Sequence, residues 1–320
     1  MVNSGPVRRN ILVIKLGALG DVVQALGPMT AIRRHHASAH IAVLTTTPYA
    51  DLIKAAGVCD DVIIDNRPRF GEFRKWLALR KTLRAGNFER VYDLQTSDRS
   101  SGYFRLFWPG PKPDWSGIAA GCSLRHVNPN RDLMHTIERQ AEQLAVAGID
   151  DVPFADLNPI VSDISHLKLP EKFCLIAPGG AEHRPAKRWP RERYRDLIRK
   201  MDADGITPVV CGTEAERALA AALIEGSVTA RNIAGETSLV DLVTVAKRAA
   251  FALGNDNGAM HIAAFAGIPS VVLYSHTSDP ALCAQRGADV TILRRQSLDD
   301  LGVDEVYAAL PVRGPIQGGS

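Results

Sequence analysis

The stretch Ile11-Leu-Val-Ile-Lys-Leu-Gly-Ala-Leu-Gly-Asp21 decides the fold class of this chain. Its first four residues form a short apolar run rich in β-branched side chains, which is typical of a buried strand. Two glycines, an aspartate and a helical pattern over about 22–35 follow. A strand, a glycine-containing turn and a helix in this order begin a β-α-β unit, so the pattern predicts a parallel sheet covered by helices.

The same alternation continues outward through the first half of the chain. We expect further strands at 41–45, 62–64 and 91–94, and helices at 49–56, 72–85 and 134–147. The segment 98–135 breaks this rhythm, because proline and tryptophan follow one another closely between 108 and 115. Such punctuation favours irregular structure, so we expect a loop-rich excursion there.

The alternation restarts after 149–170, a segment rich in Asp and Pro that is the best candidate for a domain boundary. We expect helices at 190–203, 214–225, 239–249 and 259–266, and strands at 173–177, 207–211, 231–233, 251–253 and 270–274, the last completing the set. A chain of 320 residues suits two domains, which we assign to 1–160 and 161–320. The predicted class is α/β, with two Rossmann-like domains whose parallel sheets face an interdomain crevice.

Composition limits the function. Apolar residues make up 46% of the chain, charged residues 23%, and the formal net charge is +3, all typical of an ordinary globular protein. The five cysteines are far apart and form no CxxC, so we expect neither a disulfide framework nor a zinc site.

We find no signal peptide and no apolar run of about 18 residues, and therefore expect a cytoplasmic protein. Aromatic residues amount to 6% with no basic and aromatic stripe, which argues against nucleic-acid binding.

The loops after the predicted strands are the places to look for chemistry, because ligands of open α/β sheets bind beyond the carboxyl ends of the strands. Gly17 and Gly20 allow the backbone to approach a ligand closely. Their spacing is not GxGxxG and no GK[ST] follows, which argues against a dinucleotide site and excludes a Walker A loop. Asp21 has two interpretations that remain open: a cap of the helix that follows, or a general base that takes a proton from a hydroxyl.

In the second half, the loop at 177–190 combines a glycine pair with a basic pair. The amides of Gly179 and Gly180 and the charge of Lys187 suit a diphosphate, although a solvated surface loop would have the same composition. The segment from Gly254 to His261 places a helix start after a strand. We expect an anion at that helix start. Its candidate residues are Asp256, Asn257, Gly258 and His261.

Two further patterns have competing interpretations. Glu236 and Thr237 precede Ser238, which with Asp241 resembles a capping box, and Glu236 is also a candidate to bind ribose hydroxyls. Asp202-Ala-Asp204 is a DxD sequence of the kind some glycosyltransferases use to hold a metal. Here it falls at a predicted helix end and just before a strand, so we expect a solvated helix terminus and no essential metal.

Basic residues concentrate in the segment 67–105, beginning with Arg67 and Arg69. A solvated helix face is the ordinary explanation for such a run. The alternative is a surface in the first domain that receives an anionic glycolipid and touches an anionic leaflet of the inner membrane.

The segments 14–23, 185–190 and 254–264 together resemble the ADP-heptose:lipopolysaccharide heptosyltransferases, glycosyltransferase family 9, in order and spacing along nearly the whole chain. The resemblance implies a GT-B fold and inverting, metal-independent transfer of a heptose from ADP-heptose to a lipopolysaccharide core or similar glycolipid, without a cofactor. It implies an acceptor-binding first domain and a donor-binding second domain. By this similarity Asp21 is the base and Lys187 the donor-phosphate lysine.

The same resemblance assigns Asp256, Asn257, Gly258 and His261 to the donor-binding helix start, and places Thr237 near the nucleoside. The chain departs from the family pattern at Ser275-His-Thr-Ser-Asp-Pro280, at Pro178-Gly-Gly180 and at Asn257, all on the donor side. The alternatives are a family member with another nucleotide-sugar or acceptor, a nucleotide-sugar-binding protein without turnover, and, less well supported by the glycine spacing, a nicotinamide-dependent oxidoreductase.

Overall fold

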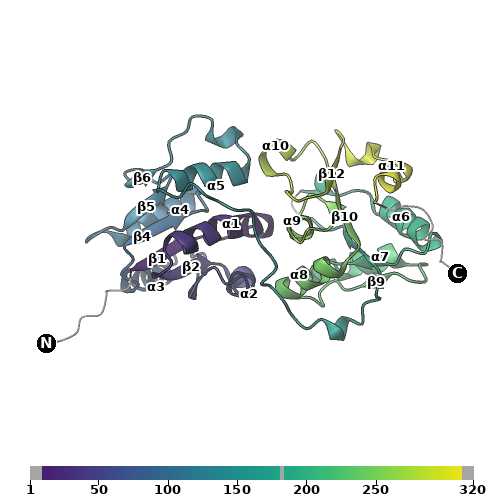
Figure 1. Ribbon diagram of the computed structural model, residues 1–320, viewed down its shortest axis with the longest axis horizontal. Helices are drawn as coiled ribbons and strands as arrows, with labels where there is room; N and C mark the ends of the chain where they lie inside the picture. The colour runs from purple at the N-terminus through teal and green to yellow at the C-terminus, as the bar shows by residue number, and fades with distance from the viewer. Residues whose placement is uncertain (1–8, 181–183, 312–320) are drawn as a thin grey trace. The chain divides into compact units, whose positions relative to one another are not determined.

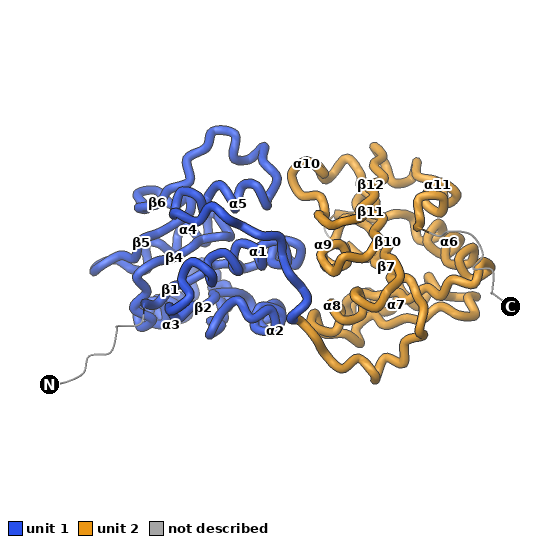
Figure 2. Tube along the Cα trace, in the orientation of Figure 1, with its two compact units in different colours: residues 1–159 blue, residues 160–320 orange. Residues whose placement is uncertain are grey.

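The computed structural model describes residues 9–180 and 184–311 of the chain. It consists of two compact units, residues 1–159 and 160–320, which are coloured separately in Figure 2. The division falls next to the boundary expected at 160. The acceptor and donor roles of the two domains stay predictions.

Unit 1 contains one six-stranded parallel sheet in the order β3-β2-β1-β4-β5-β6 (Figure 1). Its strands are β1 Asn10–Ile14, β2 His40–Thr45, β3 Asp61–Ile64, β4 Arg90–Asp93, β5 Asp114–Gly117 and β6 Leu124–Arg125. Its α-helices are α1 Leu19–His35, α2 Ala50–Ala55, α3 Phe73–Ala85, α4 Asp98–Tyr103 and α5 Thr136–Ala145. Short 3-10 turns are η1 Thr47–Tyr49, η2 Phe104–Phe107 and η3 Arg131–Leu133.

Alternation along the strands divides the core of unit 1 between the two faces of the sheet. Leu12 and Ile14 of β1 pack in one cluster with Leu79 and Leu83 of α3 and with η2. Helices α1 and α5, which are absent from that cluster, pack against each other. Because successive strand residues point to opposite faces, the sheet is enclosed by helices on both sides, as the near-continuous apolar strands predict.

Two predictions for unit 1 need correction. Helix α1 begins at Leu19, three residues before the expected start, so Asp21 lies within its first turn. The segment 98–135 is rich in loops, as expected, but it is not an excursion from the sheet, because it also contributes α4, β5 and β6. Trp115 is fully buried within β5 and packs edge to face on Phe104 and Phe107. This aromatic packing, which is not visible in the proline spacing, holds the short strand in the sheet.

Unit 2 repeats the arrangement with a sheet in the order β12-β11-β10-β7-β8-β9. Its strands are β7 Cys174–Ala177, β8 Pro208–Val210, β9 Arg231–Asn232, β10 Phe251–Asn255, β11 Ser270–Tyr274 and β12 Val290–Arg294. Its α-helices are α6 Arg191–Ala203, α7 Arg217–Ile224, α8 Leu239–Arg248, α9 Gly258–Phe265, α10 Pro280–Cys283 and α11 Val303–Ala308. The 3-10 turns are η4 Ser165–Leu167, η5 Pro185–Lys187, η6 Glu214–Glu216 and η7 Leu298–Asp300.

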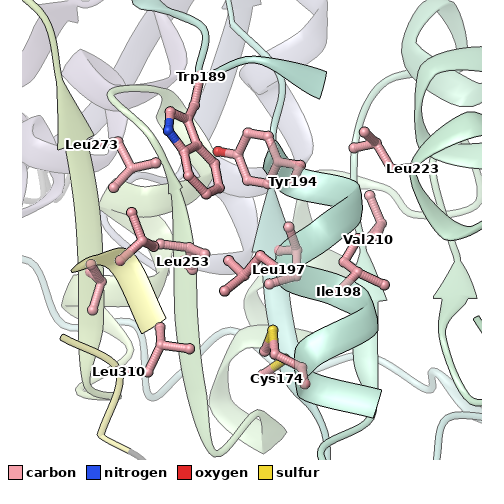
Figure 3. Close-up of a cluster of buried hydrophobic side chains, with 14 of the residues drawn as sticks. Cys174, Trp189, Tyr194, Leu197, Ile198, Val210, Leu223, Leu253, Leu273 and Leu310 are labelled. Atoms are coloured by element: carbon pink, nitrogen blue, oxygen red, sulfur yellow. The ribbon is translucent and has the colours of Figure 1, made fainter. Parts of the chain in front are cut away.

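The main core of unit 2 lies between its sheet and helices α6, α7 and α11. Leu197 and Ile198 of α6 pack there against Cys174, Val210 and Leu253 of the strands (Figure 3). Strand β12 was not expected, since β11 was predicted to complete the set. It is an edge strand with half-buried and exposed residues, and its apolar pattern is correspondingly weak. The expected alternation of helices and parallel strands is otherwise confirmed.

Within the described ranges 9–180 and 184–311, no helix is both long enough and apolar enough to pass through a bilayer.

Candidate functional site

The two sheets have the same topology, and this places a switch point in each. In unit 1 the strand order reverses between β1 and β4, and in unit 2 it reverses between β7 and β10. Ligands of doubly wound sheets bind outside the carboxyl ends of the strands at such a point. Most of the predicted site residues follow three of these strands, β1, β7 and β10, or lie at the start of the helix that comes next.

The loop after β1 has a backbone that only glycine accommodates well. Gly17 has a φ of +129°, and a Cβ at this position would lie 2.8 Å from Cε2 of Tyr49. Four residues after Gly17, the Asp21 carboxylate accepts a hydrogen bond from the backbone N–H of Ala18 at 3.2 Å. The N-cap of α1 is Ala18, so Asp21 is not the N-cap itself; it caps the helix from the first turn, by accepting the N–H of Ala18, with Gly20 beside it. The carboxylate is partly exposed, and its role as a base stays a prediction.

Lys15 is a buried cation that the sequence interpretation did not include. Its ammonium donates to the carbonyl oxygen of Leu94 at 3.2 Å, and the amide of Gln140 donates to the same oxygen at 3.4 Å. Burial lowers the pKa of Lys15, opposed mainly by the negative charge of Asp21 and to a smaller degree by that of Asp93. The loops after β1 and β4 are thus joined by a cation that faces two carboxylates.

Asp93, at the end of β4, is fully buried and was also missed. Burial raises its pKa to about 6, although backbone N–H groups of Thr96 and Gln95 donate to it and lower the pKa in part. Above this pKa, unit 1 holds a desolvated carboxylate close to Lys15. The signal in the sequence was an acidic residue ending an apolar strand.

Arg67 and Arg69 follow β3 and are exposed. The backbone of Arg67 is left-handed, with a φ of 47°, and its N–H donates to Asp65 at 2.7 Å. Burial raises the pKa of Tyr49; Arg67 lowers it and Asp21 raises it, so the phenol lies within reach of both charges. Arg67 therefore belongs to the surroundings of the β1 loop, whereas the N–H of Arg69 is bonded to Glu72 at 2.6 Å.

In unit 2 the central contact joins Lys187 and Asp256. The Lys187 ammonium donates to Oδ2 of Asp256 at 2.6 Å, and both side chains are largely buried. Burial alone would raise the pKa of Asp256, but the bond to Lys187 outweighs this and the pKa is lowered. The pair is ionised, with a cation held at the switch point. Residues 181–183 of the predicted 177–190 loop lie outside the described residues.

A second layer holds Asp256 from behind. The amide of Gln285 donates to Oδ1 of Asp256 at 3.2 Å, and its oxygen accepts the hydroxyl proton of Tyr274 at 2.8 Å. Gln285 is 2% exposed, and these two hydrogen bonds orient its amide. Sequence reasoning missed Gln285 and Tyr274, because neither stands in a recognisable motif.

The glycine pair is packed against Glu216. A Cβ on Gly179 would lie 2.1 Å from Oε1 of Glu216, so the Glu216 side chain would have to move if this position carried a side chain. The N–H of Gly180 donates to the same oxygen at 3.2 Å, and its carbonyl accepts from Arg188 at 2.6 Å. A phosphate bound here would compete with Glu216 for the Gly180 amide.

Two asparagines shape the loops around the pair. Asn257 caps α9, since its oxygen accepts from the N–H groups of Ala259 and Met260 at 3.0 and 3.2 Å. Asn255 is fully buried, and its side-chain oxygen accepts from the backbone N–H of Trp189 at 3.0 Å. The Trp189 ring packs edge to face on Tyr194 (Figure 3). Because Trp189 is anchored in the core two residues after Lys187, the loop that carries the lysine is held firmly.

The remaining candidates lie in different surroundings. Gly258 is the first residue of α9, and His261, in its first turns, is buried. Glu236 is exposed and forms an ion pair with Arg217 at 3.1 Å, beside the partly buried Thr237. The expected capping box of Ser238 and Asp241 is present, and its reciprocal bonds measure 3.1 and 2.9 Å.

The DxD sequence lies where it was predicted, at the end of α6. Asp202 accepts from Ser227 and Val228 at 2.7 Å each and anchors the loop before β9. Within the described ranges, no group of three or more His, Cys, Asp or Glu residues is placed to hold a metal ion. Metal independence stays a prediction.

The two doubly wound units, with ionisable groups at both switch points, define the GT-B class of fold. The solved structure of the ADP-heptose lipopolysaccharide heptosyltransferase II of Escherichia coli matches with a TM-score of 0.79 and 23% identity, over 94% of this chain and 97% of that one. The profile of glycosyltransferase family 9 (heptosyltransferase) matches residues 76–297, so this chain belongs to that family.

Two curated relatives from Escherichia coli K12 show the extent of the similarity. Lipopolysaccharide heptosyltransferase 2 is 38% identical over 104 residues, which are 31% of this chain and 30% of the relative. This match thus spans less than a third of the relative's length. Lipopolysaccharide heptosyltransferase 1 is 23% identical over 320 residues, 94% of this chain and 98% of the relative.

Proposed function

We propose that the protein is an inverting, metal-independent glycosyltransferase that moves a heptose from ADP-heptose to a lipopolysaccharide core or similar glycolipid. The observation that carries the proposal is the buried ion pair of Lys187 and Asp256 at the switch point of unit 2, in a chain of family 9. The relatives named above are heptosyltransferases, and one solved relative is named for ADP-heptose. The donor is the only nucleotide the proposal requires, and no cofactor takes part.

The donor is assigned to unit 2. The Lys187 ammonium shares its charge between Asp256 and the diphosphate, which develops negative charge as the glycosidic C–O bond breaks. The start of α9, with Asn257 and Gly258, supports the anion further. Gly179, Gly180 and His261 complete the phosphate surroundings, and Glu236 with Thr237 receives the nucleoside.

The acceptor is assigned to unit 1, with Asp21 as the base. The carboxylate takes the proton of an acceptor hydroxyl while that oxygen attacks the anomeric carbon on the face opposite the nucleotide. One C–O bond forms, one breaks, ADP leaves, and the anomeric configuration inverts. Gly17, Gly20 and Arg67 line the acceptor side, and Arg69 contributes positive charge.

The role of Asp21 is tested by Asp21→Asn. The amide oxygen can still accept the Ala18 N–H, so the helix start should persist, while the proton acceptor is lost. We expect transfer to fall by about 10²–10⁴ with unchanged ADP binding and an unchanged melting temperature. Asp51→Asn, on an exposed turn of α2, is the control. Turnover within a factor of three of the parent protein would reject the base.

The donor is tested by thermal shift with ADP, UDP and GDP. A ligand at one hundred times its Kd adds about 2.7 kcal/mol to the free energy of unfolding, so ADP should raise Tm by several degrees and the other two should not. Stabilisation by UDP or GDP instead would favour a family member with another donor. ADP binding without transfer to any glycolipid would favour a nucleotide-sugar-binding protein without turnover.

We place the reaction at the cytoplasmic face of the inner membrane, where such a glycolipid would be available, with peripheral membrane contact through unit 1 and without nucleic acid as a partner. Metal independence has a direct test. Transfer after exhaustive treatment with EDTA should equal untreated transfer, and restoration of lost activity by Mg²⁺ or Mn²⁺ would refute it.

A further inference from the structure

Four large apolar side chains stand out from one region of unit 1. Phe70, Phe73, Leu77 and Trp108 are 103%, 72%, 63% and 66% exposed. Phe73 and Leu77 are one turn apart on α3, whose opposite face buries Leu79 and Leu83. Helix α3 therefore presents an apolar stripe outward as well as one to the core. We call Phe70, Phe73, Leu77 and Trp108 the α3 surface.

The loops that carry the two ends of this surface are held in place. The indole of Trp76 donates to the Arg69 carbonyl at 3.1 Å, next to Phe70. Arg80 donates to the carbonyl of Trp108 at 3.0 Å, and Arg84 to that of Pro109 at 2.9 Å. Because these bonds tie both loops to α3, the four side chains form one surface on a fixed frame.

The surroundings of the α3 surface are strongly cationic. Residues 67–84 contain seven basic residues and one acidic residue, Glu72, which pairs with Lys75 at 2.6 Å. Arg74 and Lys81 are exposed on the outward part of α3, close in sequence to the apolar stripe. Long basic side chains can cover apolar surface while their charged ends reach out to anions.

We propose that the α3 surface docks the protein on an anionic lipid bilayer, with Phe70, Phe73, Leu77 and Trp108 inserted at the headgroup level. Aromatic rings and leucine are the side chains that enter this layer, and a basic ring around them binds anionic headgroups. A second copy of this chain is disfavoured as the occupant, because two such cationic surfaces repel.

The choice of a bilayer rests on the proposed function, since a glycolipid acceptor resides in one. Phe70, Phe73 and Leu77 also belong to the basic segment that begins at Arg67, whose charge acts on Tyr49 beside the β1 loop. Docking through α3 would thus bring the acceptor-side residues of unit 1 close to the lipid layer.

The first experiment is co-sedimentation of the full chain with vesicles. We expect binding to phosphatidylglycerol–phosphatidylethanolamine vesicles and at least tenfold weaker binding to phosphatidylcholine. Phe73→Ser with Leu77→Ser should weaken binding at least tenfold, and the control pair Val161→Ser with Val228→Ser, exposed apolar residues of unit 2, should not. Equal loss in the two pairs, or no loss in either, would overturn the proposal.

Charge and insertion are separated by two further measurements. Arg74→Gln and Lys81→Gln should each cost about fivefold in affinity for anionic vesicles, and 0.5 M NaCl should weaken binding of the parent protein. Brominated lipids should quench the fluorescence of Trp108, which is exposed, whereas Trp115 and Trp189 are buried and Trp76 of α3 is half-buried. Trp108→Phe should remove most of that quenching. Binding without quenching would refute insertion and with it the proposal.

Failure of docking and failure of the proposed function are distinguishable. Stabilisation by ADP in the absence of vesicles tests only the donor, and the α3 variants should retain it fully. Sedimentation velocity without lipid tests the other occupant, a second copy of this chain. The proposal would be overturned if the parent protein did not bind vesicles but self-associated, and if Phe73→Ser with Leu77→Ser abolished that self-association.

Discussion

The two units share one topology, but the lysine and the aspartate at their switch points make different contacts. In unit 2, Lys187 binds Asp256 directly, and the pKa of that carboxyl is lowered. In unit 1, Lys15 donates instead to the carbonyl of Leu94, and burial raises the pKa of Asp93 to about 6. A lysine and an aspartate therefore occur at both switch points, but the pKa of the carboxyl is shifted in opposite directions.

The difference teaches that topology selects the place and local contacts select the charge. Asp256 has a cation and the Gln285 amide as partners, which together outweigh the cost of burial. Asp93 accepts backbone N–H groups, which do not offset its desolvation. Unit 2 is thus suited to keep a cation ready for a diphosphate, whereas unit 1 holds a carboxyl close to its protonation midpoint under mildly acidic conditions.

The strongest way to break the comparison is Lys187→Met. The Asp256 carboxylate, 8% exposed, would lose its cation, and removing one partner of a buried pair costs about 3–5 kcal/mol. ADP affinity should fall about a hundredfold, because a charge-assisted contact to the diphosphate is lost. Urea denaturation and calorimetry with ADP measure the two effects.

Lys200→Met is the matched control for this variant. Lys200 pairs with the exposed Asp304 at 2.7 Å, and such a solvent-screened surface pair contributes little to stability. Lys187→Arg should keep most of the stability. If Lys187→Met and Lys200→Met were equally stable, the pair of Lys187 and Asp256 would not stabilise unit 2 as a buried ion pair.

Asp93→Asn tests unit 1 through pH. The folded pKa of about 6 lies above the unfolded value of 3.8, so the folded state retains the proton while the unfolded state loses it. Stability of the parent protein should therefore fall, relative to the variant, as pH rises from about 4 to 6, by about 3 kcal/mol in total. Thermal melts of both proteins from pH 4 to 7.5 give this difference, with Asp114→Asn at an exposed site as the control. A difference that does not vary with pH would contradict the raised pKa.

Gln285→Met sharpens the account of unit 2 with a smaller expected effect. The variant keeps the volume but removes the bonds to Asp256 and Tyr274, and a buried polar group without its partner costs about 1–3 kcal/mol. ADP affinity should fall severalfold, because Asp256 and hence Lys187 lose part of their orientation. Gln296→Met provides the comparison. Unchanged ADP affinity would show that Gln285 supports packing alone.

Lys15→Met should have the smallest effect on stability. It removes a desolvated charge along with one hydrogen bond, while Gln140 still donates to Leu94. We expect a change within about 1 kcal/mol, in contrast to Lys187→Met, because burying an ammonium that has no directly bonded carboxylate is itself costly. A loss as large as that of Lys187→Met in urea denaturation would show that the two lysines are equivalent after all.

Local patterns were sufficient for most of the fold. The predicted strand at 270–274 has the bounds of β11, and the predicted helices at 72–85 and 239–249 differ from α3 and α8 by one residue at most at each end. The failures have a common physical cause. Strands β6 and β12 are at the edges of their sheets, and β5 is next to β6. These strands form because they pair with segments distant in the sequence, and short apolar runs carry no information about that pairing.

The candidate site divides in the same way. Glycine spacing and strand ends led to the loops that carry Asp21, Lys187 and Asp256. The partners Gln285 and Lys15 were not found, since Gln285 follows Asp256 by 29 residues and Lys15 precedes Leu94 by 79.

By itself the sequence determined the alternation of strands and helices, two repeats of it, and the loops where polar residues follow buried strands. Periodicity and turn chemistry act between residues close in the chain, so they can be seen in the letters. Only the tertiary structure decided that Lys187 pairs with Asp256 across 69 residues, and that burial raises the pKa of Asp93 to about 6. Ionisation depends on desolvation and on the charges nearby, which exist only when the chain is folded.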